Sequence, residues 1–206
     1  MNRFAPLVLA SGSPRRADLL KQIGLPFEVR LPDPAVDESV RVNEKPEPYV
    51  RRLARAKALA LAAPGCVVVA ADTTVVLDDA VLGKPADSAE AQRMLLALAG
   101  RSHEVLTAVA VRRDDDCRVT LVRTRVHFRP ISREEAFAYS ETGEGMDKAG
   151  AYAIQGLGAV FVSAIEGSFS NVVGLPLAET DGLLQDLGVD TWALRRGAAG
   201  EQQEQA

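Results

Sequence analysis

The sequence feature that most constrains the fold is a short apolar run that leads directly into a helix start near the N-terminus. Residues 7–10 have the pattern of a buried strand, and apolar residues follow at helical spacing over residues 19–23. Ser13 between them is a favourable N-cap, and Pro14 suits the first helical position. A strand, a turn of small residues and a helix N-terminus therefore meet here. The unpaired N–H groups of such a helix start form a natural anion site.

Two arginines occupy the first turn of this predicted helix. Cations there are disfavoured by roughly 0.3–1 kcal/mol each unless a negative group lies beside them. A phosphate bound by Arg15, Arg16 and the N–H groups after Ser11 would supply that group. The alternative is an ordinary capped helix whose arginines extend into water, and the local pattern favours neither. The spacing of a Walker phosphate loop is absent.

Composition places the chain among globular proteins. Its 206 residues are 47% hydrophobic, enough for one sizeable core or for two lobes that share a sheet. The formal net charge of −4 argues against a general nucleic-acid binder. No apolar run reaches membrane-spanning length, and the first apolar run is too short for a secretory signal core, so we expect a cytoplasmic protein without a membrane partner. Cys66 and Cys117 lack metal-type spacing and are expected to be reduced.

Two later segments carry candidate ligands for a metal and for an anion. Asp37 and Glu38 lie in an acidic loop, residues 32–39, whose carboxylates are either merely solvated or ligands of Mg²⁺ or Mn²⁺ held together with phosphates. A helix is predicted over residues 48–63, and Lys57 falls inside its apolar stripe. Such a lysine either extends along the surface into solvent or lines a cleft where it meets an anion.

Asp72 directly follows a continuous apolar run, residues 67–71, that is typical of a strand covered on both faces. A buried carboxylate needs a donor, a cation or a metal beside it. We expect Asp72 at the carboxyl end of the strand, where α/β sheets place their ligands, the alternative being a residue that only ends the strand or begins a turn. Asp78 and Asp79 then predict a hairpin turn that returns Lys84 to the neighbourhood of Asp72.

Helix starts are also predicted by capping boxes at residues 87–90 and 132–135. The turn at residues 114–116 predicts an antiparallel pair of strands on either side of it. His103 and His127 have no matching ligands nearby in the sequence, so we expect structural roles for them and no zinc site.

A glycine-rich loop over residues 143–158 carries Gln155. Its glycines permit close approach of the main chain to a ligand, although they equally suit a flexible connection. The amide of Gln155 offers both the donor and the acceptor needed to read the edge of a base. We expect a single domain over residues 1–190, followed by a disordered tail rich in Gln and Glu over residues 191–206.

Four motifs in collinear order, over about residues 9–184, resemble those of the Maf family of nucleoside triphosphate pyrophosphatases. They are Ala10-Ser11-Gly12-Ser13-Pro14-Arg15-Arg16-Ala17-Asp18-Leu19-Leu20; the span from Ala71-Asp72-Thr73 through Gly83-Lys84-Pro85 and Leu98-Ala99-Gly100 to His103-Glu104-Val105; Gly150-Ala151-Tyr152-Ala153-Ile154-Gln155-Gly156; and Val173-Gly174-Leu175-Pro176-Leu177. The family also has an acidic pair at the place of Asp37-Glu38 and a helical lysine at the place of Lys57.

The resemblance implies an α/β fold with a mixed, twisted sheet flanked by helices and with two lobes around a cleft, similar to the inosine triphosphate pyrophosphatases. It also implies a homodimer that hydrolyses a nucleoside triphosphate between the α and β phosphates. Arg15, Thr73 and Gln155 resemble the dTTP/UTP subgroup, whereas the 7-methyl-GTP subgroup has tryptophan at the place of Arg15 and glutamine at the place of Thr73. The alternative function is a non-hydrolytic nucleotide-binding regulator of septum formation and cell division.

The roles implied for individual residues follow from the same match. Asp72 is expected to be the catalytic base, and Glu38 with Asp72 to hold a divalent metal, Mg²⁺ or Mn²⁺. The residues expected to bind the nucleoside triphosphate are Ser11, Arg15, Arg16, Lys57, Thr73, Lys84 and Gln155.

Overall fold

A computed structural model describes residues 5–31 and 36–203 of the chain. The first four residues of the predicted acidic loop, 32–35, and the last three of the predicted tail, 204–206, lie outside the described residues. The described residues form one seven-stranded mixed sheet in the order β2-β1-β3-β5-β6-β7, with β4 paired to the edge of β3. The strands are β1 (Leu7–Leu9), β2 (Glu28–Val29), β3 (Val67–Leu77), β4 (Ala80–Leu82), β5 (Ser102–Arg113), β6 (Asp116–Phe128) and β7 (Val162–Glu166).

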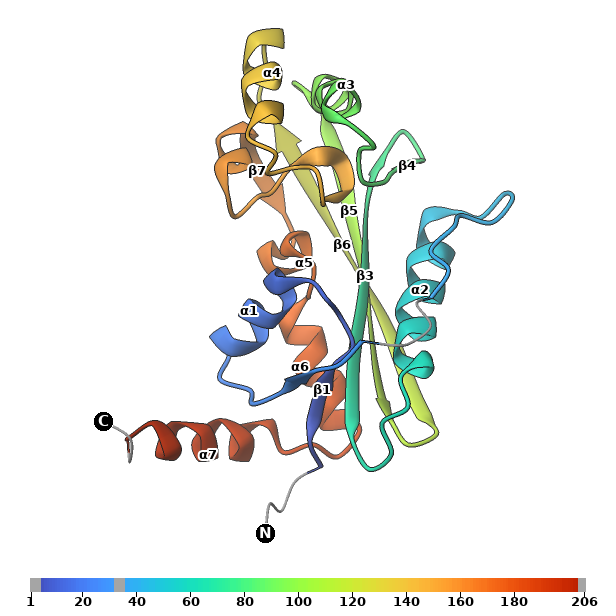
Figure 1. The fold of residues 1–206 in the computed structure, drawn as a ribbon, viewed down its shortest axis with the longest axis vertical. Helices are drawn as coiled ribbons and strands as arrows, with labels where there is room; N and C mark the ends of the chain where they lie inside the picture. The colour runs from blue at the N-terminus through green and yellow to red at the C-terminus, as the bar shows by residue number, and fades with distance from the viewer. Residues whose placement is uncertain (1–4, 32–35, 204–206) are drawn as a thin grey trace.

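Helices flank this sheet on both faces (Figure 1). They are α1 (Pro14–Gln22), α2 (Pro46–Ala60), α3 (Ser88–Leu98), α4 (Arg133–Glu141), α5 (Phe169–Val173), α6 (Leu177–Asp186) and α7 (Thr191–Gln203), with two short 3₁₀ helices, η1 (Ala149–Ala151) and η2 (Leu157–Phe161). The predicted α/β fold with a mixed sheet between helices is therefore confirmed.

Three long strands, β3, β5 and β6, run through two lobes (Figure 1). The lower lobe contains β1, β2, α1, α2, α6 and α7, and the upper lobe contains α3, α4, β4 and β7. Strands β1, β2 and β3 are parallel in the lower lobe, whereas β3, β5, β6 and β7 pair with one another in antiparallel orientation. The long strands thus belong to both lobes at once.

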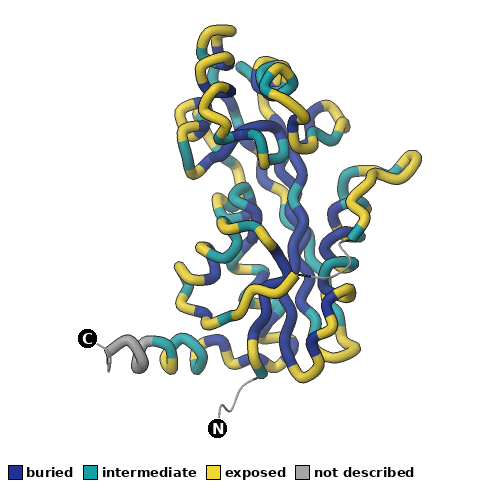
Figure 2. The backbone as a smooth tube through the Cα atoms, viewed as in Figure 1, coloured by how far each residue is buried: buried dark blue, intermediate teal, exposed yellow. Residues whose placement is uncertain are grey.

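Side chains along β3 point alternately to the two faces of the sheet, and this alternation divides the lower lobe into two cores. Val67 and Val69 pack with residues of α1 and α6 on one face, and Val68 and Ala70 pack with α2 on the other. Higher along the strand, Val75 joins a third core in the upper lobe. Buried residues accordingly follow the central strands through the whole molecule (Figure 2).

The two partners of β3 on one of its edges leave a gap between them. Leu7–Leu9 of β1 pair with Val67–Val69, and β4 pairs with residues 75–77, so among the described strands residues 70–74 are paired only with β5 on the other edge. The amide of Ala10 closes the end of β1 by donating to Val69 O at 2.8 Å. Beyond that point the edge of β3 is open, and the gap lies between the two lobes.

Several predicted turns and caps are confirmed. Asp78 and Asp79 have φ values of 50° and 63° and connect β3 to β4 as a tight hairpin. Ser132 and Glu135 form a reciprocal capping box at the start of α4. The helix predicted over residues 48–63 is shorter at its C-terminal end and begins earlier, at Pro46, which takes the first helical position.

The prediction of a disordered tail is wrong over most of its length, because residues 191–203 form helix α7. Asp190 caps this helix by accepting the amide of Ala193 at 2.8 Å, and Leu194 packs against the lower core. Arg195 donates to Ile23 O at 2.9 Å and pairs with Asp181 at 2.6 Å. The composition of the tail misled the prediction because these few residues supply the contacts that dock the helix.

In the part of the chain that the structure describes, no helix has both the length and the apolar character needed to cross a membrane. Cys66 and Cys117 are both free thiols, as expected.

Candidate active site

A cavity of about 590 Å³ lies at the open edge of β3, between the two lobes. It is bounded by the turn after β1, by α2, by the segment after β4 and by the loop that precedes β7. Asp37 is not among its lining residues, but all the other residues that the sequence singles out for a site line this cavity, which we call the cleft. They are Ser11, Arg15, Arg16, Glu38, Lys57, Asp72, Thr73, Lys84 and Gln155.

Asp72 lies in the middle of β3, so its prediction as the residue at a strand end is wrong. The strand continues to Leu77 because β5 pairs with it up to Val76. Asp72 lies instead just past the carboxyl end of the shorter neighbour β1, which ends at Leu9. Ligands of α/β sheets bind at such ends. Asp72 is therefore beyond the carboxyl end of a strand, as expected, but that strand is β1 and not β3.

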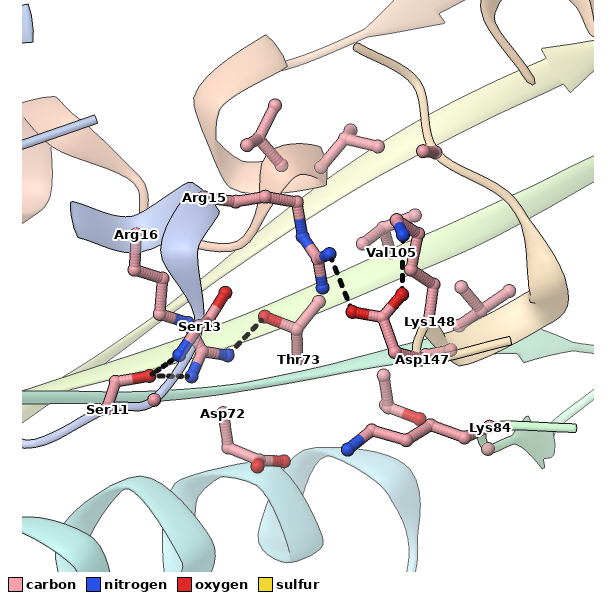
Figure 3. Close-up of a pocket in the computed structure, with 18 of the residues that line it drawn as sticks. Ser11, Ser13, Arg15, Arg16, Asp72, Thr73, Lys84, Val105, Asp147 and Lys148 are labelled. Atoms are coloured by element: carbon pink, nitrogen blue, oxygen red, sulfur yellow. Dashed lines mark hydrogen bonds and ion pairs between the residues drawn. The ribbon is translucent and has the colours of Figure 1, made fainter. Parts of the chain in front are cut away.

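Asp72 and Thr73 point to opposite faces of β3, as neighbours in a strand must. Asp72 meets Lys57 of α2 on one face, and Thr73 meets Arg16 of α1 on the other. Figure 3 shows Asp72 on one side of the strand and Thr73 with Arg16 on the other. The open edge allows both faces to contribute to one cleft.

Lys57 joins two carboxylates. Its Nζ atom lies 2.8 Å from Asp72 Oδ1 and 2.6 Å from Glu38 Oε1. The side chain of Lys57 is only 15% exposed and that of Asp72 only 9%, so this ion pair is shielded from solvent. Lys57 therefore lines the cleft, as the second of its two predicted alternatives requires.

The two carboxylates differ in the direction of their pKa shifts. Burial raises the pKa of Asp72 above its ordinary value, against the opposing effect of Lys57 and Arg16. Glu38 is more exposed; burial raises its pKa also, but the hydrogen bond and charge of Lys57, with the charges of Lys84 and Arg16, bring that pKa below its ordinary value. Asp72 is consequently the stronger base of the two.

A divalent cation fits the two carboxylates only with further ligands. Within residues 5–31 and 36–203, no three Asp, Glu, His or Cys side chains are grouped closely enough to hold a metal. Glu38 and Asp72 nevertheless converge on one cationic atom, Lys57 Nζ. Mg²⁺ is commonly held by one or two carboxylates together with substrate phosphates, and the donor set matches that pattern.

Arg16 is fixed by three hydrogen bonds beneath the cleft. Its Nε donates to Gly174 O at 2.8 Å, Nη1 to Ser11 Oγ at 3.0 Å and Nη2 to Thr73 Oγ1 at 3.2 Å. Burial lowers the pKa of Arg16, while Asp72 opposes that effect. A guanidinium has five N–H donors, so one N–H remains on each Nη atom. The remaining pair is suited to bidentate binding of a phosphate.

Arg15 reaches across the cleft to the upper lobe. Its Nη1 lies 3.1 Å from Asp147 Oδ2, and Lys148 Nζ lies 2.5 Å from Asp147 Oδ1 (Figure 3). Lys84 extends from the end of the β3–β4 hairpin toward Asp72, as predicted (Figure 3). Gln155 lines the cleft from the loop before η2.

Sequence reasoning did not assign roles to several residues at the cleft. Asp147 and Lys148 were recognised only as members of a glycine-rich loop. Tyr49 also lines the cleft, and its hydroxyl donates to Glu38 O at 3.0 Å. The charge of Asp147 between the glycines of the loop could have indicated that it lies at the site. Nothing in the sequence distinguishes Tyr49 from the other residues of its amphipathic helix.

The charges that line the cleft favour an anionic ligand. They comprise five cations, Arg15, Arg16, Lys57, Lys84 and Lys148, against three carboxylates, Glu38, Asp72 and Asp147. The chain as a whole has a net charge of −4, so the positive charge is concentrated locally. A polyphosphate beside a buried carboxylate is the chemistry that this arrangement supports.

Comparisons with known proteins match nearly the whole described chain. The dTTP/UTP pyrophosphatase of Symbiobacterium thermophilum is 52% identical over 184 residues, which cover 88% of this chain and 94% of that protein. The dTTP/UTP pyrophosphatase of Anaeromyxobacter dehalogenans is 54% identical over 186 residues, 88% of this chain and 94% of that protein. The one from Vibrio parahaemolyticus is 49% identical over 189 residues, 90% of this chain and 99% of that protein.

Among solved structures, a HAM1 protein from Coxiella burnetii shares the fold, with a TM-score of 0.50 and 17% identity over 89% of this chain and all of that one. The family model described as "Maf-like protein" matches residues 6–187. That range contains every residue that lines the cleft, from Ala10 to Val173. The chain therefore belongs to the Maf family.

Proposed function

We propose that this chain hydrolyses dTTP and UTP, and modified pyrimidine nucleotides of the same shape, between the α and β phosphates. The products are the nucleoside monophosphate and pyrophosphate, and the reaction removes nucleotides from the cellular pool. The observation that carries the proposal is that five cations and a buried carboxylate line one cleft. The relatives named dTTP/UTP pyrophosphatase, about half identical over most of the chain, support the same reaction and substrates.

Asp72 is the general base of the proposed reaction. Its burial raises its pKa, so the carboxylate gains affinity for the proton of an attacking water. Lys57 holds it at 2.8 Å before substrate binds. The triphosphate competes with Asp72 for Lys57, and a carboxylate that loses its cationic partner becomes a stronger base. The water oxygen bonds to phosphorus as the anhydride bond breaks, and the proton passes to Asp72.

The cations hold the triphosphate and stabilise the charge that develops as pyrophosphate leaves. Arg16 offers its two remaining N–H groups from a fixed position, and Ser11 supports that position. Arg15, Lys57 and Lys84 approach the same volume from three other elements. Glu38 and Asp72 are the residues that would hold Mg²⁺ or Mn²⁺, which when bound neutralises phosphate charge and acidifies water.

In the proposed reaction Gln155 selects the base, whereas Thr73 acts on the phosphates. Gln155 lines the cleft from the upper lobe, and its amide can match the donor and acceptor on a pyrimidine edge. Thr73 is held against Arg16 rather than directed to solvent, so it acts on the phosphates through that arginine. We also propose a cytoplasmic homodimer, for which sedimentation of the purified chain is the test.

The experiment is to measure pyrophosphate release from dTTP, UTP, CTP, GTP and 7-methyl-GTP, with and without Mg²⁺ or Mn²⁺, for the wild type and Asp72→Asn. The expected result is metal-dependent release from dTTP and UTP that the substitution abolishes. Binding of these nucleotides without release from any of them would contradict the proposal and favour the non-hydrolytic regulator.

A further inference from the structure

The loop that carries Gln155 is folded around the side chain of Glu144. Oε1 of Glu144 accepts the amide of Leu157 at 2.9 Å, and Oε2 accepts the amide of Gly158 at 3.0 Å and the hydroxyl of Tyr139 at 2.7 Å. One carboxylate thereby satisfies two main-chain donors directly after Gln155. Gly158 is buried, and its N–H group would be costly to leave without such a partner, so this carboxylate helps to determine the path of the loop.

Tyr139 carries the same restraint to the other side of Gln155. Its hydroxyl accepts the amide of Ala153 at 3.1 Å while it donates to Glu144. The ring is 5% exposed and packs edge-on against Phe161, with 5.1 Å between the centroids. The main chain is therefore tied down two residues before Gln155 and two residues after it.

The loop lies directly against this pair of side chains. A Cβ atom on Gly156 would overlap Glu144 Oε1, and one on Gly158 would lie 2.9 Å from the hydroxyl oxygen of Tyr139. The carbonyl of Glu144 is held in turn by Lys148 Nζ. Gly156 and Gly158 are explained by this close packing and not by flexibility.

Glu144 and Tyr139 are not themselves part of the cleft wall. The loop contributes several residues to the described lining of the cleft, Ile154 and Gln155 among them, but neither Glu144 nor Tyr139 is one of the lining residues. Burial raises the pKa of Glu144, but the Tyr139 hydroxyl and the two amides together bring it below its ordinary value. The carboxylate is thus ionised at neutral pH and accepts from all three donors.

We propose that Glu144 and Tyr139 form a clamp that fixes the main chain on both sides of Gln155 and thereby sets the preference of the cleft for pyrimidine nucleotides. The inference rests on the proposed function, in which Gln155 contacts the base. Glu144 and Tyr139 are positioning residues: they act on the nucleotide only through the placement of Gln155. A side chain held in advance loses little entropy on binding, and its hydrogen bonds then discriminate between bases.

Two substitutions open the clamp with little change of volume. Tyr139→Phe removes the hydroxyl that joins Ala153 to Glu144, and Glu144→Gln places an NH₂ group against main-chain donors. We expect each to lower the ratio of kcat/KM for dTTP to that for GTP by about 3- to 10-fold, the worth of one hydrogen bond. The loss should lie mainly in KM, because Asp72 and the cations are not disturbed.

The decisive comparison is made in a chain that already lacks the Gln155 amide. In a Gln155→Ala background, Tyr139→Phe should lower the same ratio by less than about twofold, since coupled residues are not additive. Glu135→Gln is the matched control, because Glu135 is a carboxylate of the same lobe that caps α4 and pairs with Arg129 away from the cleft. It should reduce thermal stability and leave the ratio unchanged.

Binding of the products gives a readout that does not depend on turnover. The ratio of Kd values for dTMP and GMP should change in parallel with the kinetic ratio for each variant. Failure of the wild type to release pyrophosphate would contradict the proposed function, while the Kd ratios still test the clamp. Equal affinity of the wild type for dTMP and GMP would overturn the clamp, as would unchanged ratios in Tyr139→Phe and Glu144→Gln.

Discussion

The hydroxyl oxygens of Thr73 and Thr107 lie 3.0 Å apart on neighbouring strands, and the direction of the hydrogen bond between them is determined by their other partners. Thr107 donates to Asn171 O at 2.9 Å, which uses its one hydrogen. Thr73 must therefore donate to Thr107, and it accepts from Arg16. Toward the cleft, Thr73 can only accept a hydrogen bond, so its role is to orient the arginine.

This series of hydrogen bonds predicts that a substitution of Thr107, which does not line the cleft, changes the kinetics. Thr107→Val removes the acceptor of the Thr73 hydrogen, and we expect KM for dTTP to rise by about 3- to 10-fold because the Thr73 hydroxyl, one of the three acceptors that hold Arg16, is no longer fixed. Thr107→Ser retains the hydroxyl and should restore KM. Steady-state kinetics with dTTP measure both, and an equal KM for the two variants would contradict the hydrogen-bond direction.

Replacing Asp72 tests the assignment of the base. Asp72→Asn keeps the shape of the side chain but cannot take a proton from water, so kcat for dTTP should fall by about 10²- to 10⁴-fold. Pyrophosphate release under saturating dTTP measures the effect. Asp78→Asn is the control, because that residue lies in the adjoining hairpin turn at φ 50°, a conformation that asparagine adopts readily. A loss of less than tenfold in Asp72→Asn would refute the assignment.

Removing the cation between the two carboxylates should shift the pH profile. Lys57→Met leaves Asp72 and Glu38 as neighbouring negative charges, so the pKa of Asp72 should rise further. The base is active when deprotonated, so kcat/KM increases with pH through that pKa, and this acid limb should move to higher pH in the variant. Lys21→Met, on the exposed surface of α1, is the control and should leave the profile in place.

Two Gly→Ala substitutions should have opposite effects on stability. Gly156→Ala forces its methyl group against Glu144 Oε1, so we expect a lower melting temperature and a reduced preference for dTTP over GTP. A Cβ atom on Gly182 in α6 would meet no heavy atom within 4 Å, and Gly182→Ala should stabilise the chain by about 0.5–1 kcal/mol. Thermal denaturation measures the stability of both variants, and kcat/KM for dTTP and for GTP measures the preference of Gly156→Ala.

His103 should make the free energy of unfolding depend on pH. It is 2% exposed beside Tyr152, and burial lowers its pKa from 6.5 to about 4. Between these two values the unfolded chain binds a proton that the folded chain does not, so stability is lost as the pH falls through this window. The loss is about 3 kcal/mol. Urea denaturation at several pH values should show a flatter dependence for His103→Gln, and an unchanged slope would contradict the assignment.

The sequence predicted which residues line the cleft better than it predicted how those residues contact one another. Lys57 was identifiable because a lysine inside an apolar helical stripe requires an explanation, and its ion pair with Asp72 supplies one. The continuation of β3 beyond Asp72 was not predictable, because three polar residues in succession resemble the end of a strand. Only the long neighbour β5 shows why the strand goes on.

Contacts between distant segments account for the rest. The Arg15–Asp147 bridge joins residues 132 positions apart, and no local pattern reveals such a pair. Glu144 belongs to the same category: its partners Leu157 and Gly158 become apparent only when the loop is folded. Helix α7 was missed because composition describes the average of a segment, whereas individual residues such as Leu194 and Arg195 make the contacts that dock it.

The two lobes share one continuous frame. Strands β3 and β5 are paired without interruption from Val67 to Val76, and β5 and β6 from Ser102 to Arg113, so both ladders pass the level of the cleft. Bending the lobes toward one another would require these ladders to break or shear, which makes the frame stiff at the place where many two-lobed enzymes have a hinge. We therefore expect the separation of the lobes to change little when a nucleotide binds, so that discrimination between nucleotides depends on the contacts that a base makes within the cleft.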